Sequence, residues 1–339
     1  MNSRHLGGVI GMFFLLCMTF GCASDNIPVV PPAGTGMVFQ RTLTETYDCV
    51  FSIVDYHAIT IDYDVESFQK SIMNAARTLI ACGLDPGKCR LFVQSRVIEH
   101  TELAWILNCI TPLGDLERMT QFKDKSKQHR ENINVGLLAY PVLQAADIML
   151  YKSTAVPVGE DQIQHIEFTR RIARRFNGKF GDTFPEPKWL LSSTPKILGL
   201  DGKAKMSKSL NNDIGLLENP DDIWEKLRTA VTDENRKRLK DPGDPEICNL
   251  YTMHTVFSPD DVVADVAAQC KAASRGCVDC KKILFENLMK ELAPIQAKAK
   301  VLEERPDDIS DILNDGASKC SETAKEVMEE VRRKMKLIG

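Results

Sequence analysis

Short apolar runs alternate with segments of helical periodicity through the first two thirds of the chain. Residues 49–54 (CVFSIV) are apolar and β-branched and end at Asp55, which is typical of a parallel strand buried on both faces. Residues 91–94 (LFVQ) and 155–158 (AVPV) have the same character. Strands that alternate with helices predict an α/β fold, a Rossmann-like doubly wound parallel sheet.

Helical spacing of apolar residues fills the intervals between these runs. One helix is expected after Asp64, a good N-cap, and it is expected to close at Gly83 and Pro86. Further helices are predicted over residues 99–111, 135–151 (with a bend near Pro141) and 159–177.

Strand signals stop after Asn219, and helices are predicted over residues 221–231, 259–273, 278–304 and 317–335. The expected domains are therefore a Rossmann-like catalytic domain over residues 47–218 and a C-terminal α-helical domain over residues 219–339. Residues 1–46 form an atypical N-terminal segment.

The N-terminal segment imitates a secretory signal. Arg4 precedes an apolar run over residues 9–20, and Cys22 then follows a glycine, as in a lipoprotein signal. A run of this length is too short to span a bilayer. We interpret residues 1–46 as signal-like or foreign sequence.

Composition limits the function. The chain has 339 residues and 43% hydrophobic content, enough for a full core. A net charge of -4 argues against a generally basic nucleic-acid binder, so any contact with RNA must use local patches.

The segment Lys205-Met206-Ser207-Lys208-Ser209 indicates phosphate chemistry. Its two lysines are three residues apart, lie among small residues and follow a glycine-containing turn, so both ammonium groups can reach one polyphosphate. A solvated lysine loop is the alternative reading of the same residues.

A second nucleotide signal is Gly159-Glu160-Asp161-Gln162, which ends a predicted strand and opens a helix. Glycine allows a ligand to approach the backbone, the helix start offers free N–H groups, and a carboxylate can accept hydrogen bonds from ribose. Acidic residues could instead only complement the helix dipole.

Four of the eleven cysteines, Cys248, Cys270, Cys277 and Cys280, lie within one short window. The last two form a C-x2-C pair, a spacing that lets two thiolates face one metal centre. A disulfide, a zinc site and an iron–sulfur cluster all fit these cysteines, and four unrelated buried thiols are the remaining reading.

Five motifs, in order, resemble the bacterial tryptophanyl-tRNA synthetases, a family of class I aminoacyl-tRNA synthetases. The resemblance extends from about Tyr47 to Gly339. The motifs are residues 53–58 (IVDYHA), 116–123 (LERMTQFK), 140–151 (YPVLQAADIMLY), 158–162 (VGEDQ) and 205–209 (KMSKS).

The resemblance implies activation of L-tryptophan by ATP, with Mg²⁺, followed by transfer to tRNA(Trp) in the cytoplasm by a homodimer whose helical domain reads the tRNA. Lys205 and Lys208 would be catalytic, and Asp147 would accept the indole N–H, because a carboxylate in an apolar pocket selects for a donor. His165 is expected to be structural. Tyr140 and Gln162 would hold the amino-acid end, and ATP would contact Gly159, Glu160, Asp161, Ile197, Lys205, Met206, Ser207, Lys208 and Ser209.

Some members of this family carry a [4Fe-4S] cluster on nearly the same cysteine pattern. The resemblance therefore ranks the cluster first at Cys248, Cys270, Cys277 and Cys280 and zinc second. Lys281 and Lys282, beside the last cysteine, become candidate phosphate contacts for tRNA.

The N-terminus departs from the family pattern, which begins with a strand and a His-x-Gly-His-like motif. The only remnant is near His5 and Gly7, which receive no catalytic role. Two alternatives to an active ligase follow: a catalytically impaired homologue that still binds tRNA or tryptophan, and a surface lipoprotein. A tyrosine-charging enzyme is disfavoured by Asp147 together with residues 159–162.

Overall fold

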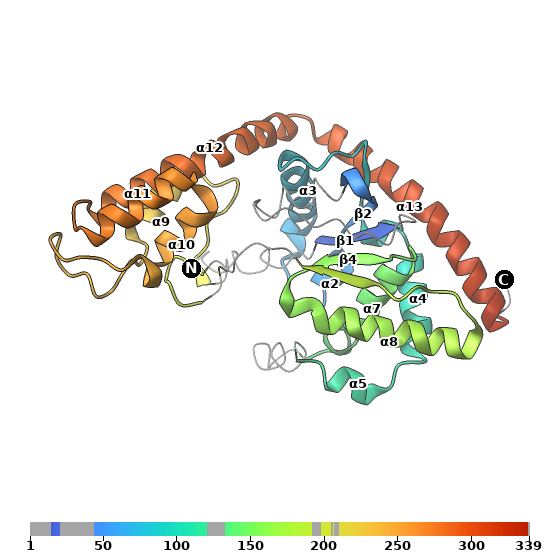
Figure 1. Cartoon of the computed structure of the whole chain (residues 1–339). Coiled ribbons are helices and arrows are strands. Elements are labelled where there is room, and N and C mark those ends of the chain that lie inside the picture. Colours follow the sequence, from blue (N-terminus) through green and yellow to red (C-terminus); the bar gives the residue numbers. More distant parts are fainter. Residues whose placement is uncertain are drawn as a thin grey trace, which may run out of the picture.

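The computed structural model describes residues 15–20, as backbone, and residues 44–120, 133–191, 198–204, 206 and 210–337. It contains an α/β unit and a helical unit, which the long helix α12 (Cys277–Glu303) connects. Figure 1 shows this helix leaving the helical unit at the left and continuing into α13 beside the sheet.

The α/β unit is built on a five-stranded sheet with the order β3-β2-β1-β4-β5. Strands β2 (Asp48–Ile53) and β3 (Cys89–Val93) are parallel, and so are β4 (Ala155–Val158) and β5 (Lys188–Leu191). The three strands predicted from apolar runs are thus confirmed. Strand β5 was missed because its apolar run, Trp189-Leu190-Leu191, is short, and three of its four residues are exposed.

The central strand is β1 (Leu15–Phe20), which runs antiparallel to both β2 and β4. It lies in the segment that the sequence suggested was signal-like or foreign. Six residues of this segment therefore form a strand of the sheet. The rest of the segment up to residue 43 lies outside the described residues.

Strand β2 is buried on both faces, as its sequence predicted. Phe51 belongs to one hydrophobic cluster, with α3 (Val65–Ala81), and Val50 belongs to the other. The cluster that contains Val50 also holds α7 (Val135–Met149), with Pro141 inside it. Helix α7 packs against α4 (Glu99–Asn108) and α8 (Ile163–Phe180). Short elements complete the unit: α2 (Asp55–Ala58), η2 (Gln94–Arg96), α5 (Leu113–Glu117) and η3 (Glu160–Gln162).

The helical unit has its own core around Ile223, Leu250 and Leu284. The sequence missed one of its helices, α10, because the segment lacks a clear apolar period. The elements are α9 (Pro220–Thr229), η5 (Pro245–Ile247), α10 (Asn249–Phe257), α11 (Asp260–Lys271) and α12.

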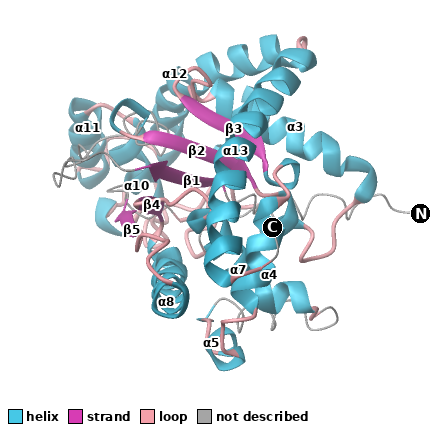
Figure 2. Cartoon of the chain, turned by 90° about the vertical axis from the view of Figure 1, so that its right-hand side faces the viewer, coloured by secondary structure: helices cyan, strands magenta, loops and turns pink. Residues whose placement is uncertain are grey.

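The last helix, α13 (Pro306–Met335), packs against β3 and α4 rather than inside the helical unit. Figure 2 shows it lying across the strands. Ile309 joins the cluster on one face of the sheet and Val327 joins the cluster on the other. The predicted helical domain, residues 219–339, thus includes a helix that packs on the sheet of the α/β unit. No helix among the described residues has the length and apolar character that crossing a membrane requires.

Candidate functional site

Polar residues gather where β2, β3 and β4 end. Parallel strands bring their carboxyl ends to the same edge of a sheet, so the segments that follow them lie together. Asp55, after β2, is buried, and its Oδ1 accepts a hydrogen bond of 3.0 Å from the amide of Ser95, after β3. Gln94 precedes Ser95, and Gly159 follows β4.

Asp147 of α7 is fully buried behind this edge, and three side chains bind its carboxylate. Oδ1 accepts from Nε2 of Gln94 at 2.7 Å and contacts Nδ1 of His100 at 2.6 Å. Oδ2 contacts Nε2 of His57 at 2.8 Å. The carboxylate is therefore held by donors from the ends of two strands and from α4.

The electrostatics of Asp147 keep this carboxyl ionised. Burial by itself would raise its pKa, but hydrogen bonds from His100 and His57 outweigh burial and lower the pKa from 3.8 to about 2. An ionised carboxylate can only accept hydrogen bonds, so its oxygens form a fixed acceptor pair inside an apolar helix.

Tyr140 lies one to two helical turns before Asp147 on the same helix. Its hydroxyl contacts Nε2 of His165 at 3.2 Å, and its ring meets the His57 ring edge-on, with centroids 6.2 Å apart. Burial raises the pKa of Tyr140 well above its usual value, so the hydroxyl remains a neutral donor and acceptor. His165 is buried, as expected for a packing residue, and it also orients the Tyr140 hydroxyl.

The segment after β4 combines an exposed start with a buried end. Gly159, Glu160 and Asp161 are exposed, whereas Gln162 is buried and donates to Oδ2 of Asp161 at 3.0 Å. A Cβ on Gly159 would approach Oδ1 of Asp161 to 2.8 Å, which explains why glycine suits this position. No hydrogen bond between Gln162 and Asp147 is found among the described residues.

The turn before the lysine segment is ordered by Asp201. Its Oδ1 accepts hydrogen bonds from the amides of Lys203 and Ala204. Gly202, which directly follows Asp201, has a φ of +66°, a backbone conformation that favours glycine. Met206 packs on the core of the helical unit. The candidate residues Ile197, Lys205, Ser207, Lys208 and Ser209 lie outside the described residues.

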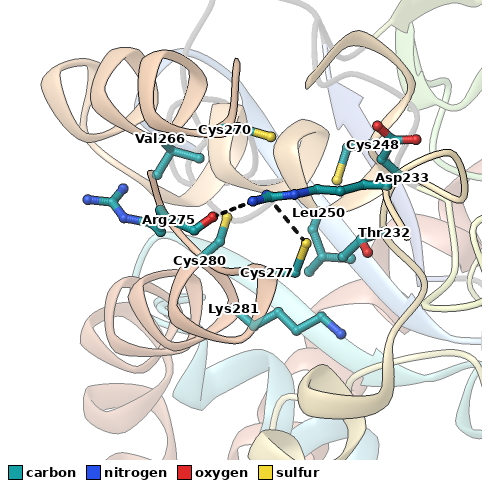
Figure 3. A pocket seen from close by; sticks show the side chains of 11 residues that line it. Thr232, Asp233, Cys248, Leu250, Val266, Cys270, Arg275, Cys277, Cys280 and Lys281 are labelled. Carbon is teal, nitrogen blue, oxygen red and sulfur yellow. Dashed lines mark hydrogen bonds between the residues drawn. The ribbon is translucent and has the colours of Figure 1, made fainter. Parts of the chain in front are cut away.

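The four cysteines singled out by their spacing line one pocket in the helical unit (Figure 3). Cys248 caps α10, Cys270 lies near the end of α11, and Cys277 and Cys280 lie in the first turn of α12. The sequence missed two neighbours with N–H groups. Nη1 of Arg236 lies 3.8 Å from Sγ of Cys277, and Nε2 of His254 lies 3.4 Å from Sγ of Cys280.

Burial, together with the nearby Cys248, Cys270 and Cys277, raises the pKa of the Cys280 thiol to about 12. The same two causes raise the pKa of Cys270, against the opposing effect of Arg236. Several thiolates in this pocket would repel one another, so they require a compensating positive centre. Within the described ranges, however, no set of three or more His, Cys, Asp or Glu side chains is arranged to hold a metal ion.

One expectation beside this pocket is wrong. Lys281 is buried, and its ammonium donates to the carbonyl oxygens of Arg228 and Ala230 at 2.8 and 2.6 Å. It therefore ties α12 to the end of α9 and is not available to a phosphate. Lys282 is exposed.

Comparison with known proteins identifies the family of this chain. The family of class I tRNA synthetases for tryptophan and tyrosine matches residues 34–293. The tryptophan–tRNA ligase of Deinococcus radiodurans is 50% identical over 289 residues, covering 84% of this chain and 87% of the relative. That of Thermotoga maritima is 43% identical over 298 residues, covering 87% and 90%.

A solved structure is similar over nearly its whole length. It is the tryptophanyl-tRNA synthetase of Campylobacter jejuni, complexed with ADP and tryptophan, with a TM-score of 0.80 and 32% identity, covering 90% of this chain and 98% of that one. These relatives do not favour the alternative of an impaired homologue. The chain belongs to the class I tRNA synthetases, among the tryptophan–tRNA ligases.

Proposed function

We propose that this tryptophan–tRNA ligase selects its amino acid through Asp147. The supporting observation is the uneven use of its two buried oxygens. Oδ1 is occupied by Gln94 and His100, whereas Oδ2 meets only His57 among the residues that the structure describes. Since each carboxylate oxygen offers about two acceptor directions, Oδ2 retains capacity for an indole N–H. A phenylalanine-like ligand has no donor at that place, and a buried acceptor left without a donor disfavours it.

The remaining site residues are assigned by their place around this carboxylate. Tyr140 and Gln162 would hold the amino and carboxyl groups of the substrate, since Tyr140 shares α7 with Asp147 and Gln162 lies at the strand edge. The ATP contacts would be Gly159, Glu160, Asp161, Ile197 and the segment from Lys205 to Ser209.

The chemistry follows from positioning and charge. The tryptophan carboxylate attacks the α-phosphate of ATP, pyrophosphate leaves, and the aminoacyl group then passes to the 3′ end of tRNA(Trp). Lys205 and Lys208 would stabilise the charge that develops on the phosphates, and Mg²⁺ bound with ATP would neutralise the phosphates. No covalent bond to the protein is needed.

The experiment that tests this function is pyrophosphate exchange with tryptophan and with tyrosine. The wild type is expected to exchange with tryptophan only, and Asp147→Ala is expected to lose roughly 1.5–3 kcal/mol of discrimination, the usual worth of a hydrogen bond to a charged group. A variant that remains folded and still selects tryptophan would contradict the role of Asp147. Wild-type exchange with neither amino acid would contradict the function.

We also propose that Cys248, Cys270, Cys277 and Cys280 hold a [4Fe-4S] cluster. The donors fit, because four thiols from three helices surround one pocket and a cluster places its sulfur ligands on four separate irons. Structural zinc usually joins two short cysteine pairs, whereas these four cysteines contain one such pair. Such a cluster would fix the start of α12 to α10 and α11.

Protein purified without oxygen is expected to be brown, with broad absorbance in the violet-blue region that Cys277→Ser removes. Cys109→Ser is the matched control, because Cys109 is exposed and lies in the other unit. A colourless protein with one equivalent of zinc would decide for zinc. A protein with neither metal would leave four unrelated thiols.

The helical unit, with Lys282 exposed beside the cysteine pocket, is proposed to contact the tRNA.

We further propose a cytoplasmic homodimer. A groove of about 410 Å³ lies between α4 and the start of α7, and Trp105 beside it is 71% exposed. An exposed apolar surface of this kind is typical of a protein–protein interface.

A further inference from the structure

A line of buried polar side chains continues behind Asp147, away from the strand edge. His100, whose Nδ1 contacts Asp147, contacts the hydroxyl of Tyr151 through Nε2 at 2.8 Å. Tyr151 in turn forms a hydrogen bond with the thiol of Cys320. His100, Tyr151 and Cys320 are completely buried. The line therefore joins α7 to α4, returns to the end of α7 and reaches α13.

The chemistry of these groups determines which of them donates each hydrogen bond along this line. An ionised carboxylate offers no hydrogen, so Nδ1 of His100 must carry the hydrogen it shares with Asp147. Tyr151 can both donate and accept, so it satisfies Nε2 of His100. The Phe92 ring is stacked on the imidazole at a centroid distance of 5.7 Å and limits its rotation. A histidine held at both nitrogens and on one face is a rigid donor.

Helix α13 supports this line from outside. Arg332 of α13 donates to Glu102 of α4 through Nε at 2.8 Å, and Glu102 lies two residues from His100. Cys320 reaches Tyr151 from the same helix. One contact of α13 thus holds the segment of α4 that carries the imidazole, and the other holds Tyr151 at the end of α7, although α13 itself contributes no group to the substrate site.

We infer that His100 is a positioning residue for Asp147, and that Tyr151 and Cys320 of the returning C-terminal helix fix its imidazole. This inference rests on the proposed role of Asp147. The three residues orient the carboxylate so that Oδ2 faces the substrate. Without His100, the carboxylate can rotate, and the advantage of a substrate that carries an N–H decreases.

The test compares tryptophan with its benzothiophene analogue, in which sulfur replaces the indole N–H. The readouts are the ratio of the two kcat/KM values in pyrophosphate exchange and the KM for ATP. His100→Leu is expected to lower the ratio at least about tenfold, which corresponds to one hydrogen bond to a charged group. His100→Asn, which keeps a donor near Nδ1, is expected to retain most of the ratio, and the KM for ATP is expected to stay the same.

Cys320→Ala and Cys49→Ala form a matched pair, because both thiols are fully buried and Cys49 lies in β2 away from the line. Only Cys320→Ala is expected to lower the ratio, by a smaller factor than His100→Leu. Equal effects of the two would mean that general packing is responsible and would overturn the inference for α13. A folded His100→Leu with the wild-type ratio would overturn it for His100.

Asp147→Ala separates the inference from the function on which it rests, because an unchanged ratio in that variant would contradict the role of Asp147 itself. A second measurement needs no substrate. With ¹⁵N-labelled histidine, one of the six histidines is expected to show a strongly downfield Nδ1–H signal that Asp147→Asn shifts and Tyr151→Phe broadens. Histidine signals that stay the same in both variants would overturn the positioning role.

Discussion

Asp147 illustrates how single residues set the chemistry of this protein. Burial of a charged carboxylate is costly, and here hydrogen bonds from Gln94, His57 and His100 offset that cost. The proposed selection of tryptophan over other amino acids depends on the same arrangement, because an acceptor that is already ionised and oriented needs no reorganisation when an N–H donor binds.

The lowered pKa of Asp147 predicts a specific acid dependence of stability. Its folded pKa of about 2 lies below the ordinary 3.8, so its stabilising effect is complete above pH 4 and is lost as pH falls from about 4 towards 2. Urea unfolding across this range is expected to show the stability difference between wild type and Asp147→Asn shrinking by roughly 2 kcal/mol. A difference that is independent of pH would mean that the carboxyl titrates normally.

At the scale of elements, α13 covers a sheet edge that would otherwise be exposed. Strand β3 is the outermost strand on its side, and unpaired edges favour unwanted pairing. The helix crosses this edge with Ile309 on one face and Val327 on the other. Gly316 lies between these two residues, where the helix approaches the strand most closely. A Cβ there would come within 2.0 Å of the carbonyl oxygen of Leu91.

Gly316→Ala is therefore expected to destabilise the protein by about 1–3 kcal/mol, because the helix must move away from β3. Gly178→Ala is the matched control. Gly178 also lies inside a helix, with no atom within 4 Å of a new Cβ, so this change is expected to stabilise by about 0.5–1 kcal/mol. Thermal unfolding of both variants is the measurement. A gain in stability for Gly316→Ala would show that the contact is not tight.

At the scale of the whole molecule, two packed units share one long connection through α12, and the α/β unit presents an apolar groove. Trp105 and Ile59, which line the groove, are exposed by 71% and 44%. Tyr140, a candidate substrate residue, also lines it. Pairing of two copies here would cover the exposed apolar side chains of the groove.

Trp105→Glu is expected to convert the proposed homodimer into a monomer, because a charge placed in an apolar interface leaves it unpaired and buried. Val301→Glu, at an exposed position of α12, is expected to leave the dimer intact. Sedimentation equilibrium distinguishes the two states. A monomeric wild type, or a dimer that persists in Trp105→Glu, would exclude this surface as the interface.

Much of the fold could be read from local pattern. The strand at Phe51, the cap at Asp64 and the start of α12 at Cys277 follow from apolar runs, a capping side chain and a helix-opening glycine, and these are short-range effects. Strand β5 and helix α10 could not be read in this way, because neighbours in space, not their own sequence, stabilise them.

The candidate site was predicted in part. Asp147 and Tyr140 were proposed from the resemblance to the family, and the four cysteines stood out by spacing. His57, Gln94 and His100 were missed as partners of Asp147, although they follow strand ends or open a helix. Their roles depend on distances across 90, 53 and 47 residues of sequence, which no local pattern reports.

By itself, the sequence determined the family and the order of most elements, because periodicity, capping and motifs are properties of neighbouring residues. Only the tertiary structure decided that β1 occupies the centre of the sheet antiparallel to its neighbours, that α13 returns to β3, and that Lys281 is buried. Each of these results depends on which surfaces meet when distant segments pack.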